Sequence, residues 1–164
     1  MKRRSFVFSG LAAFASACAK PEIKERPLTD VTGIVVQKHV RKMHLMSDKE
    51  ILKTYDVGLG FAPEGHKQIQ GDGKTPEGLY YIDRKNHKSR FYLSLGVSYP
   101  NTNDTIRAAS FGASPGGDIF IHGKGPRYKA ASGDWTWGCI AVEDNEIEEI
   151  FAAVPYRTPI LITP

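Results

Sequence analysis

One cysteine and one histidine in the second half of the chain have the types and spacing needed for thiol chemistry. Cys139 follows a glycine where a glycine-rich stretch meets an apolar segment. His122 ends the short apolar run Asp118-Ile-Phe-Ile-His122. A free thiol is only slightly ionised near neutral pH, and a neighbouring imidazolium activates it by lowering its pKa. If the two segments pair as strands, imidazole and thiol meet at the same end of a sheet, so we predict a His122–Cys139 catalytic pair.

Neither residue is diagnostic alone, because a single Cys is most often a small buried hydrophobe and a single His a structural one. Two features favour chemistry. Cys139 is the only cysteine in the part of the chain expected to fold, and a free thiol in an oxidising compartment invites oxidation. Residues 123–138 form a long glycine-rich connection, and connections of this length often carry function. Gly138 allows close backbone approach, so the Gly138 and Cys139 amides are candidate oxyanion donors.

These segments resemble the catalytic signature of the YkuD-type L,D-transpeptidases. That family shows a His, a spacer in the middle teens, and then Ser/Thr-His-Gly-Cys-x-Asn. Here the matching residues are His122, Thr136, Gly138 and Cys139. Trp137 replaces the second His and Ala141 replaces the Asn. Residues 71–82 also resemble the strand-turn segment of the family, and the resemblance covers roughly residues 31–163.

The resemblance implies a mainly β fold, a β-rich α+β domain of the YkuD type, and a cysteine acyltransferase that acts on peptidoglycan stem peptides. By this resemblance Cys139 is the nucleophile that forms a thioester and releases the terminal D-amino acid. His122 is the general base that later protonates the departing amine. Thr136, Gly138 and Gly123 shape the turns and the oxyanion site. An amine then resolves the thioester and makes a crosslink.

The departures from the family pattern leave the acceptor open. With water as acceptor the same chemistry becomes that of a carboxypeptidase, or of an amidase that frees a protein from peptidoglycan. A non-catalytic peptidoglycan-binding lipoprotein is a further alternative. Trp135 and Trp137 either line the pocket or pack as core or rim aromatics. Basic residues that are candidates for substrate binding, with ordinary surface charge as the alternative, are Lys74, Arg107, Arg127 and Lys129.

We expect no metal and no cofactor. The remaining histidines show no metal-ligand spacing with each other or with Cys139. The stretch Gly71-Asp-Gly-Lys-Thr75 lacks the spacing of a phosphate-binding loop.

The elements that must position this pair are mostly strands, in keeping with 16 Gly and 10 Pro. Alternation and turn residues predict strands over 33–40, 44–46, 51–59, 79–83, 91–99, 118–122, 139–142 and 159–163. A short helix is expected over 104–109. The best-marked helix follows the Cys139 strand, with an Asn145-x-x-Glu148 capping box, apolar residues at helical spacing and a stop at Pro155. We predict one catalytic domain over residues 31–164.

The N-terminus has the pattern of an export signal. Residues 1–17 combine three basic residues, a thirteen-residue apolar stretch and Ala15-Ser16-Ala17. That stretch is shorter than the roughly 20 residues of a spanning helix. Cys18 follows in a segment that resembles a bacterial lipobox with Ala in the usual Leu position, so its lipidation stays open. Residues 18–30 are expected to form a tether, and a twin-arginine export route is possible.

The positive net charge comes mainly from the export signal and does not indicate an acidic partner. The chain of 164 residues carries a net charge of +4, from 22 basic and 18 acidic residues. Without the three basic residues of the leader, 19 basic residues face 18 acidic ones. We therefore expect no nucleic acid partner. We expect a monomer in the periplasm or cell envelope whose partners are stem peptides, touching a membrane only through a lipid on Cys18.

Overall fold

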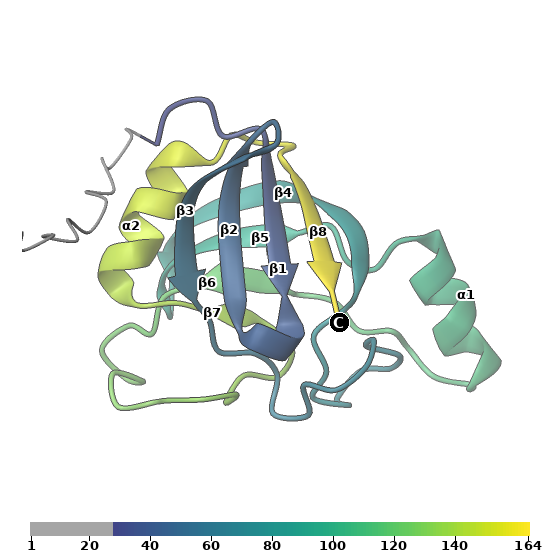
Figure 1. Ribbon diagram of the computed structural model, residues 1–164. Coiled ribbons are helices and arrows are strands. Elements are labelled where there is room, and N and C mark those ends of the chain that lie inside the picture. Colours follow the sequence, from purple (N-terminus) through teal and green to yellow (C-terminus); the bar gives the residue numbers. More distant parts are fainter. Residues whose placement is uncertain (1–27) are drawn as a thin grey trace, which may run out of the picture.

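The computed structural model describes residues 28–164 (Figure 1). The predicted export signal over residues 1–17, the lipidation site Cys18 and most of the predicted 18–30 tether lie outside this range. No helix within residues 28–164 is long and apolar enough to cross a membrane.

The described residues form one eight-stranded sheet and two α-helices, which confirms the expected mainly β fold. The strand order is β3-β2-β1-β8-β4-β5-β6-β7, with parallel pairing only between β1 and β8 and between β6 and β7. The elements are β1 (Gly33–Gln37), a 3-10 helix (Lys38–Val40), β2 (Lys42–Ser47), β3 (Glu50–Asp56), β4 (Gly78–Ser89), β5 (Tyr92–Val97), α1 (Thr102–Ser110), β6 (Phe120–His122), β7 (Ile140–Ala141), α2 (Asp144–Ala153) and β8 (Pro159–Thr163).

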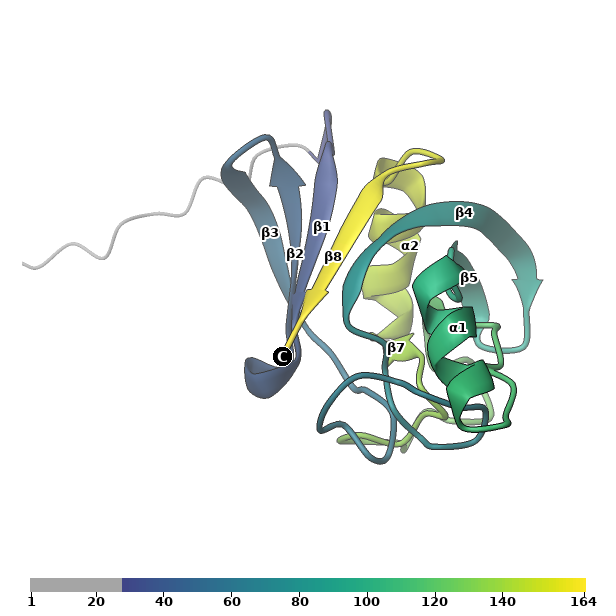
Figure 2. The same cartoon turned by 90° about the vertical axis from the view of Figure 1, so that its right-hand side faces the viewer.

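The long strand β4 folds the sheet over onto itself, as its arched path in Figure 2 shows. Its first residues pair with β8, whereas the residues from Ile82 onward pair with β5, with a register shift between Ile82 and Arg84. The apolar faces enclosed in this way form a single core together with α2, which contacts β5 and β6. Its fully buried side chains include Ile34, Met43, Leu45, Tyr80, Ile82, Leu95, Ile121, Ile140, Ile147 and Ile160. The same core thus supports the strand that ends at His122 and the helix that follows Cys139.

The predicted elements occur in the predicted order, and three of them are longer than expected: β2, β4 and α1. The strand expected over 79–83 extends to Ser89, through exposed polar residues that carry no apolar alternation. These residues are ordered by backbone pairing with β5. The helix expected over 104–109 begins at Thr102, because the side chain of Asn101 accepts a hydrogen bond from the Asp104 amide at 3.0 Å.

The predicted cap of α2 is wrong by two residues. The helix begins at Asp144, and the Glu143 amide donates to Glu146 Oε2 at 2.9 Å, in place of the expected Asn145–Glu148 pair. The carboxylate of Glu148 instead accepts a hydrogen bond from the hydroxyl of Tyr92 on β5. The start of the helix is therefore set by the acidic residues that directly follow β7.

Candidate active site

The two predicted catalytic residues lie on neighbouring strands. His122 ends β6 and pairs with Ala141 of β7, whereas Cys139 directly precedes β7. The pairing is parallel, so the two side chains cannot meet at one end of the sheet as predicted. Side chains two residues apart on a strand share a face, and this register places the cysteine opposite Phe120, two residues before His122. The thiol and the imidazole therefore share a face of the sheet rather than an end.

A cleft of about 380 Å³ contains both groups. Its walls come from the tip of the β4–β5 hairpin and from the residues around β6. The lining residues are Asn86, Lys88, Ser89, Arg90, Phe91, Ser94, Asp118, Phe120, His122 and Cys139. A peptide bond bound in this cleft has a nucleophile and a base within the same space.

The His122 ring is held in one tautomer. It is buried, with 2% of its surface exposed, and Nδ1 lies 2.6 Å from the carbonyl oxygen of Gly123. A carbonyl only accepts, so Nδ1 carries the hydrogen and Nε2 is left as the acceptor. Burial lowers the pKa of His122, although the hydrogen bond to Gly123 opposes this shift. The ring is therefore neutral at pH 7 and able to take up a proton.

Aromatic side chains fix the plane of this ring. Phe91, in the β4–β5 turn, stacks on His122 with ring centroids 4.4 Å apart. Trp135 meets the imidazole edge-on at 5.7 Å and stacks on Tyr128 at 5.1 Å. Trp135 lines a second cavity, of about 210 Å³, and not the cleft of the thiol. It packs against the imidazole and restrains it, rather than lining the wall of the nucleophile's cleft.

The start of α2 fixes the backbone that follows His122. Asp144 Oδ1 accepts hydrogen bonds from the amides of Lys124 and Gly125 at 2.7 and 2.8 Å. A Cβ atom on Gly123 would lie 2.6 Å from that same oxygen and 2.9 Å from Ile147 Cγ2. Only glycine fits here, and its carbonyl is the one that orients His122.

The turn before Cys139 is built from its own polar groups. Thr136 is 4% exposed, and its hydroxyl donates to the Cys139 carbonyl at 2.7 Å and accepts from the Gly138 amide at 3.2 Å. Gly138 has a φ of 119°, and a Cβ there would lie 2.6 Å from the Lys74 carbonyl oxygen. Thr136 and Gly138 thus shape the turn. The Gly138 amide is occupied within it, whereas the Cys139 amide has no acceptor among residues 28–164.

Two segments from the first half of the domain hold this turn in place. The Thr136 amide donates to the Leu59 carbonyl at 3.0 Å, and the Phe61 amide donates to the Thr136 carbonyl at 2.9 Å. The Gly60 amide in turn donates to the hydroxyl of the fully buried Thr75 at 3.0 Å. No role for Thr75 is predictable from its residue type alone, although it lies in the stretch that carries the second part of the family resemblance.

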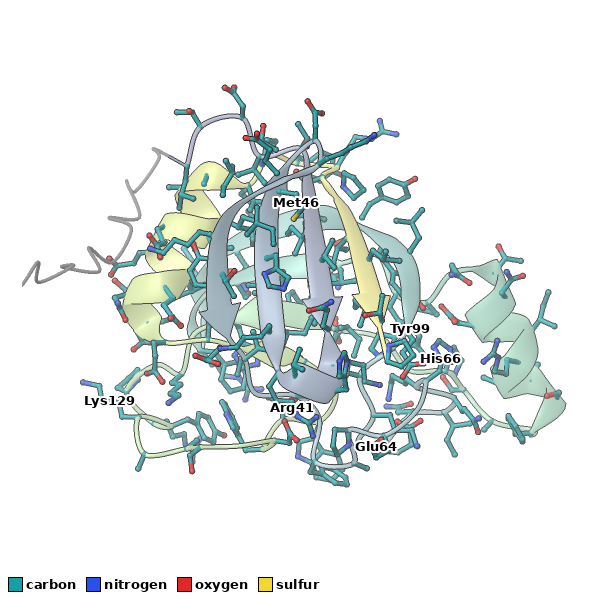
Figure 3. All side chains as sticks on the ribbon, viewed as in Figure 1. Arg41, Met46, Glu64, His66, Tyr99 and Lys129 are labelled. Atoms are coloured by element: carbon teal, nitrogen blue, oxygen red, sulfur yellow. The ribbon has the colours of Figure 1, made fainter. Side chains whose placement is uncertain are left out.

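Asp134 ties the long 123–138 loop to the other end of the chain. Its Oδ2 lies 2.8 Å from Arg41 Nη2, and its Oδ1 accepts from the Leu59 amide at 3.0 Å. Figure 3 shows Arg41 below the β1–β2 connection, facing this loop. No sequence pattern predicts this pair, because its members are 93 residues apart.

The thiol of Cys139 is protonated at rest. Its Sγ lies 3.5 Å from the Asp118 carbonyl oxygen, to which it donates. Burial raises the pKa of Cys139 to about 11, although the Phe120 amide favours the thiolate. The sequence-based expectation that an imidazolium lowers the thiol pKa is therefore wrong for the resting site, because burial keeps the imidazole itself neutral. The pair is a neutral thiol beside a neutral base.

The other predicted substrate-binding residues do not line this cleft. The ammonium group of Lys74 donates to the Glu64 carbonyl, and Trp137 is 71% exposed with its ring edge-on to Phe61. Arg127 is exposed on the loop that also carries Lys129, which Figure 3 shows at the far side of the molecule from α1. The basic residues that do line the cleft are Lys88 and Arg90, which the sequence analysis missed because nothing in the sequence shows that this hairpin reaches His122.

Known proteins match this chain in sequence and in fold. The model of the YkuD family, described as the L,D-transpeptidase catalytic domain, matches residues 32–162. The "Putative L,D-transpeptidase YafK" of Escherichia coli (strain K12) is 30% identical over 156 residues, which cover 90% of this chain and 57% of that protein. The "Putative L,D-transpeptidase YqjB" of Bacillus subtilis (strain 168) is 24% identical over 142 residues, which cover 85% of this chain and 75% of that protein. The chain therefore spans little more than half the length of YafK.

Two solved structures illustrate the likeness in fold. A variant of the helical cell shape determining protein Pgp2 from Campylobacter jejuni superposes with a TM-score of 0.62 at 25% identity, covering 86% of this chain and 51% of that one. The L,D-transpeptidase from Xylanimonas cellulosilytica superposes with a TM-score of 0.55 at 10% identity, covering 82% and 61%. At 10% identity the second match concerns the fold alone.

Proposed function

This chain belongs to the YkuD family of L,D-transpeptidase catalytic domains, and from that membership we propose that it is an exported cysteine acyltransferase acting on peptidoglycan stem peptides. One observation carries the proposal. Cys139 and His122 line the same cleft, and His122 is held through one ring nitrogen so that the other remains a proton acceptor. These are the parts that covalent catalysis by a thiol requires.

The first half-reaction forms a thioester. Nε2 of His122 takes the proton of Cys139 while Sγ attacks a peptide carbonyl carbon, so the costly thiolate never accumulates. The Cys139 amide donates to the oxyanion of the tetrahedral intermediate. The Gly138 amide does not take this role, because it already donates to the Thr136 hydroxyl. The imidazolium then gives its proton to the departing nitrogen. The carbon–nitrogen bond breaks, and the terminal D-amino acid leaves.

The second half-reaction passes the acyl group to an acceptor. An acceptor amine attacks the thioester, His122 takes the amine proton, and the thiol recovers it as the new amide forms. This gives a crosslink between stem peptides, with a role in building the cell wall. Transfer to an amine is the first candidate because it is the reaction that names the family.

Hydrolysis is the second candidate, because the residues that depart from the family pattern leave the acceptor open. Ala141, at the position of the family's Asn, lines the separate cavity of about 210 Å³, which contains neither Cys139 nor His122. Water as acceptor converts the same thioester into a free carboxylic acid. The products are then those of a carboxypeptidase, or of an amidase that detaches a protein from peptidoglycan.

Product analysis of purified sacculi tests the proposal. The protein and its Cys139→Ala variant are incubated with sacculi, which are then digested so that the muropeptides can be quantified. New crosslinks identify transfer, free D-alanine without crosslinks identifies a carboxypeptidase, and a released protein anchor identifies an amidase. Each product must disappear with Cys139→Ala. If neither protein forms a product and both bind sacculi equally well, the result would contradict an enzyme and support a non-catalytic wall-binding protein.

A further inference from the structure

The catalytic cleft carries two cationic side chains that the thiol mechanism does not use. Lys88 is the last residue but one of β4 and is exposed, and Arg90 lies in the turn to β5. Both line the cleft together with Cys139. Within residues 28–164 neither side chain has an ion pair, although Lys38, Lys42, Lys53 and Lys67 each pair with an acid. These cations are therefore free to meet a ligand.

The cleft concentrates positive charge, with two basic lining residues against one acidic one. Its only acidic lining residue is Asp118, whose carboxylate is exposed and lies 3.6 Å from the guanidinium of Arg84, outside the lining set. Without its leader the chain is almost neutral, with 19 basic residues against 18 acidic ones. The positive charge in the cleft is thus local. Clefts with walls of one sign concentrate ligands of the opposite sign.

The hairpin tip that carries these cations is fixed relative to His122. Phe91 follows Arg90 and stacks on His122, and its amide donates to Ser89 Oγ at 3.1 Å. A Cβ atom on Gly125 would lie 2.9 Å from the Arg90 carbonyl oxygen, so the loop after His122 packs directly on the turn. The backbone that carries both cations is therefore held in place before a ligand arrives, which lowers the entropic cost of binding.

We propose that Lys88 and Arg90 bind a free terminal carboxylate of the peptide substrate and so select peptides that end near the bond to be broken. The inference rests on the proposed function, of which it defines the substrate preference. An arginine fork holds a carboxylate through two parallel hydrogen bonds, and the lysine adds a point charge. A peptide whose end is amidated keeps its shape but loses the charge, and it binds more weakly.

The test is a comparison of two peptides in a protein that cannot turn them over. Cys139→Ala is titrated with a stem tetrapeptide ending in D-alanine and with its C-terminal carboxamide, and both affinities are measured by calorimetry. We expect the carboxylate to bind about tenfold more tightly, the size of one charge-assisted hydrogen bond. Adding Lys88→Gln and Arg90→Gln should abolish this difference, because only the peptide with a free carboxylate then binds more weakly. Adding Lys49→Gln, in the β2–β3 turn, leaves the ratio intact.

Three outcomes overturn the inference: equal affinities in Cys139→Ala, a ratio that survives the loss of both cations, or equal loss with Lys49→Gln. Lys49, Lys88 and Arg90 are exposed, so the fold tolerates their replacement, and thermal melts check this for each protein, including Cys139→Ala. Acylation of the unmodified protein by the same peptides, followed by intact mass, separates the two proposals. A carboxylate preference without a thioester supports the carboxylate site and contradicts the transferase. A thioester without a preference for the carboxylate supports the transferase and contradicts the carboxylate site.

Discussion

Two largely buried histidines of this domain occupy contrasting surroundings. His66 accepts the Glu77 amide at Nδ1, at 2.9 Å, so its proton is on Nε2, which lies 3.1 Å from Asp104 Oδ1. His122 uses Nδ1 for the Gly123 carbonyl, its Nε2 has no partner among residues 28–164, and the ring lines a cleft that also holds a thiol. His66 makes a hydrogen bond through Nδ1 only, and its buried Nε2 lies near a carboxylate without hydrogen-bond geometry, away from any nucleophile. A histidine in such a site supports the fold, whereas one with an acceptor nitrogen near a nucleophile can move a proton. The difference is in the partners, not in the residue type.

The surroundings of His66 connect α1 to the sheet. Asp104 is 4% exposed, and its Oδ2 accepts from the Tyr80 hydroxyl and from the Asn101 amide, each at 2.9 Å. Burial and the bond to Asp104 raise the pKa of Tyr80, so its hydroxyl stays a donor. In the view of Figure 3, His66 lies on the side of the molecule that carries α1. This network holds a helix in place and contains no nucleophile.

The largest contrast is expected in catalysis. His122→Gln removes the proton acceptor, so acylation of Cys139 should fall about 10²- to 10⁴-fold. His66→Gln should change the acylation rate per folded molecule by less than about threefold, because the residue lies outside the cleft and moves no proton. Single-turnover acylation followed by intact mass measures both rates. Equal losses of acylation rate in the two variants would contradict the different roles assigned to the two histidines.

The reverse contrast is expected in stability. Asp104→Asn replaces an acceptor oxygen in the His66 network with an amide group and should lower the free energy of unfolding by about 1–3 kcal/mol. Denaturant titration measures this loss. The acylation rate of the folded fraction should stay near that of the parent, and a rate loss as large as that of His122→Gln would show that the network serves the reaction directly.

A smaller effect is expected in the pH dependence of stability. Burial lowers the pKa of His122 below its usual value of about 6.5, so the unfolded chain takes up this proton first as the pH falls. Stability is therefore lost as the pH drops below about 6.5 and levels off below the folded-state pKa. Melting curves between pH 7.5 and about 5 should show a shallower fall for His122→Gln than for the parent. Parallel curves would contradict the burial of a neutral imidazole.

The smallest effect is expected at Trp137, where the family carries a second histidine. The ring is 71% exposed and does not line the cleft. Trp137→Ala should change the free energy of unfolding by about 0.5 kcal/mol or less. Acylation should stay within about twofold of the parent, because His122 alone supplies the base. Calorimetry and the acylation assay check both values, and a large rate loss would give this position a part in forming the thioester.

Patterns in the sequence predicted the parts of the site that depend on local order. The apolar run before His122 and the Gly-Cys step marked β6 and the start of β7, and turn residues marked the meander of β1, β2 and β3. The second half of β4 had no such pattern, because its order comes from pairing with β5. For the same reason, Lys88 and Arg90 gave no signal.

The protonation states of the pair depend on burial, which only the folded chain provides. Nothing in the spacing of His122 and Cys139 shows that burial lowers one pKa and raises the other. The parallel pairing of β6 and β7 likewise depends on the long loop between them, which leaves both directions open. The residue types of the pair were predictable. The protonation states of the two side chains and the parallel direction of their strands were not.

Trapping the acyl-enzyme tests the central claim most directly. The protein is mixed with a stem tetrapeptide ending in D-alanine, quenched in acid and weighed by mass spectrometry, with Cys139→Ala and His122→Gln in parallel. We predict an added mass equal to the peptide without its D-alanine, located on Cys139 by digestion, absent from Cys139→Ala and strongly slowed in His122→Gln. No added mass, or the same added mass on Cys139→Ala, would contradict a thiol nucleophile at this position.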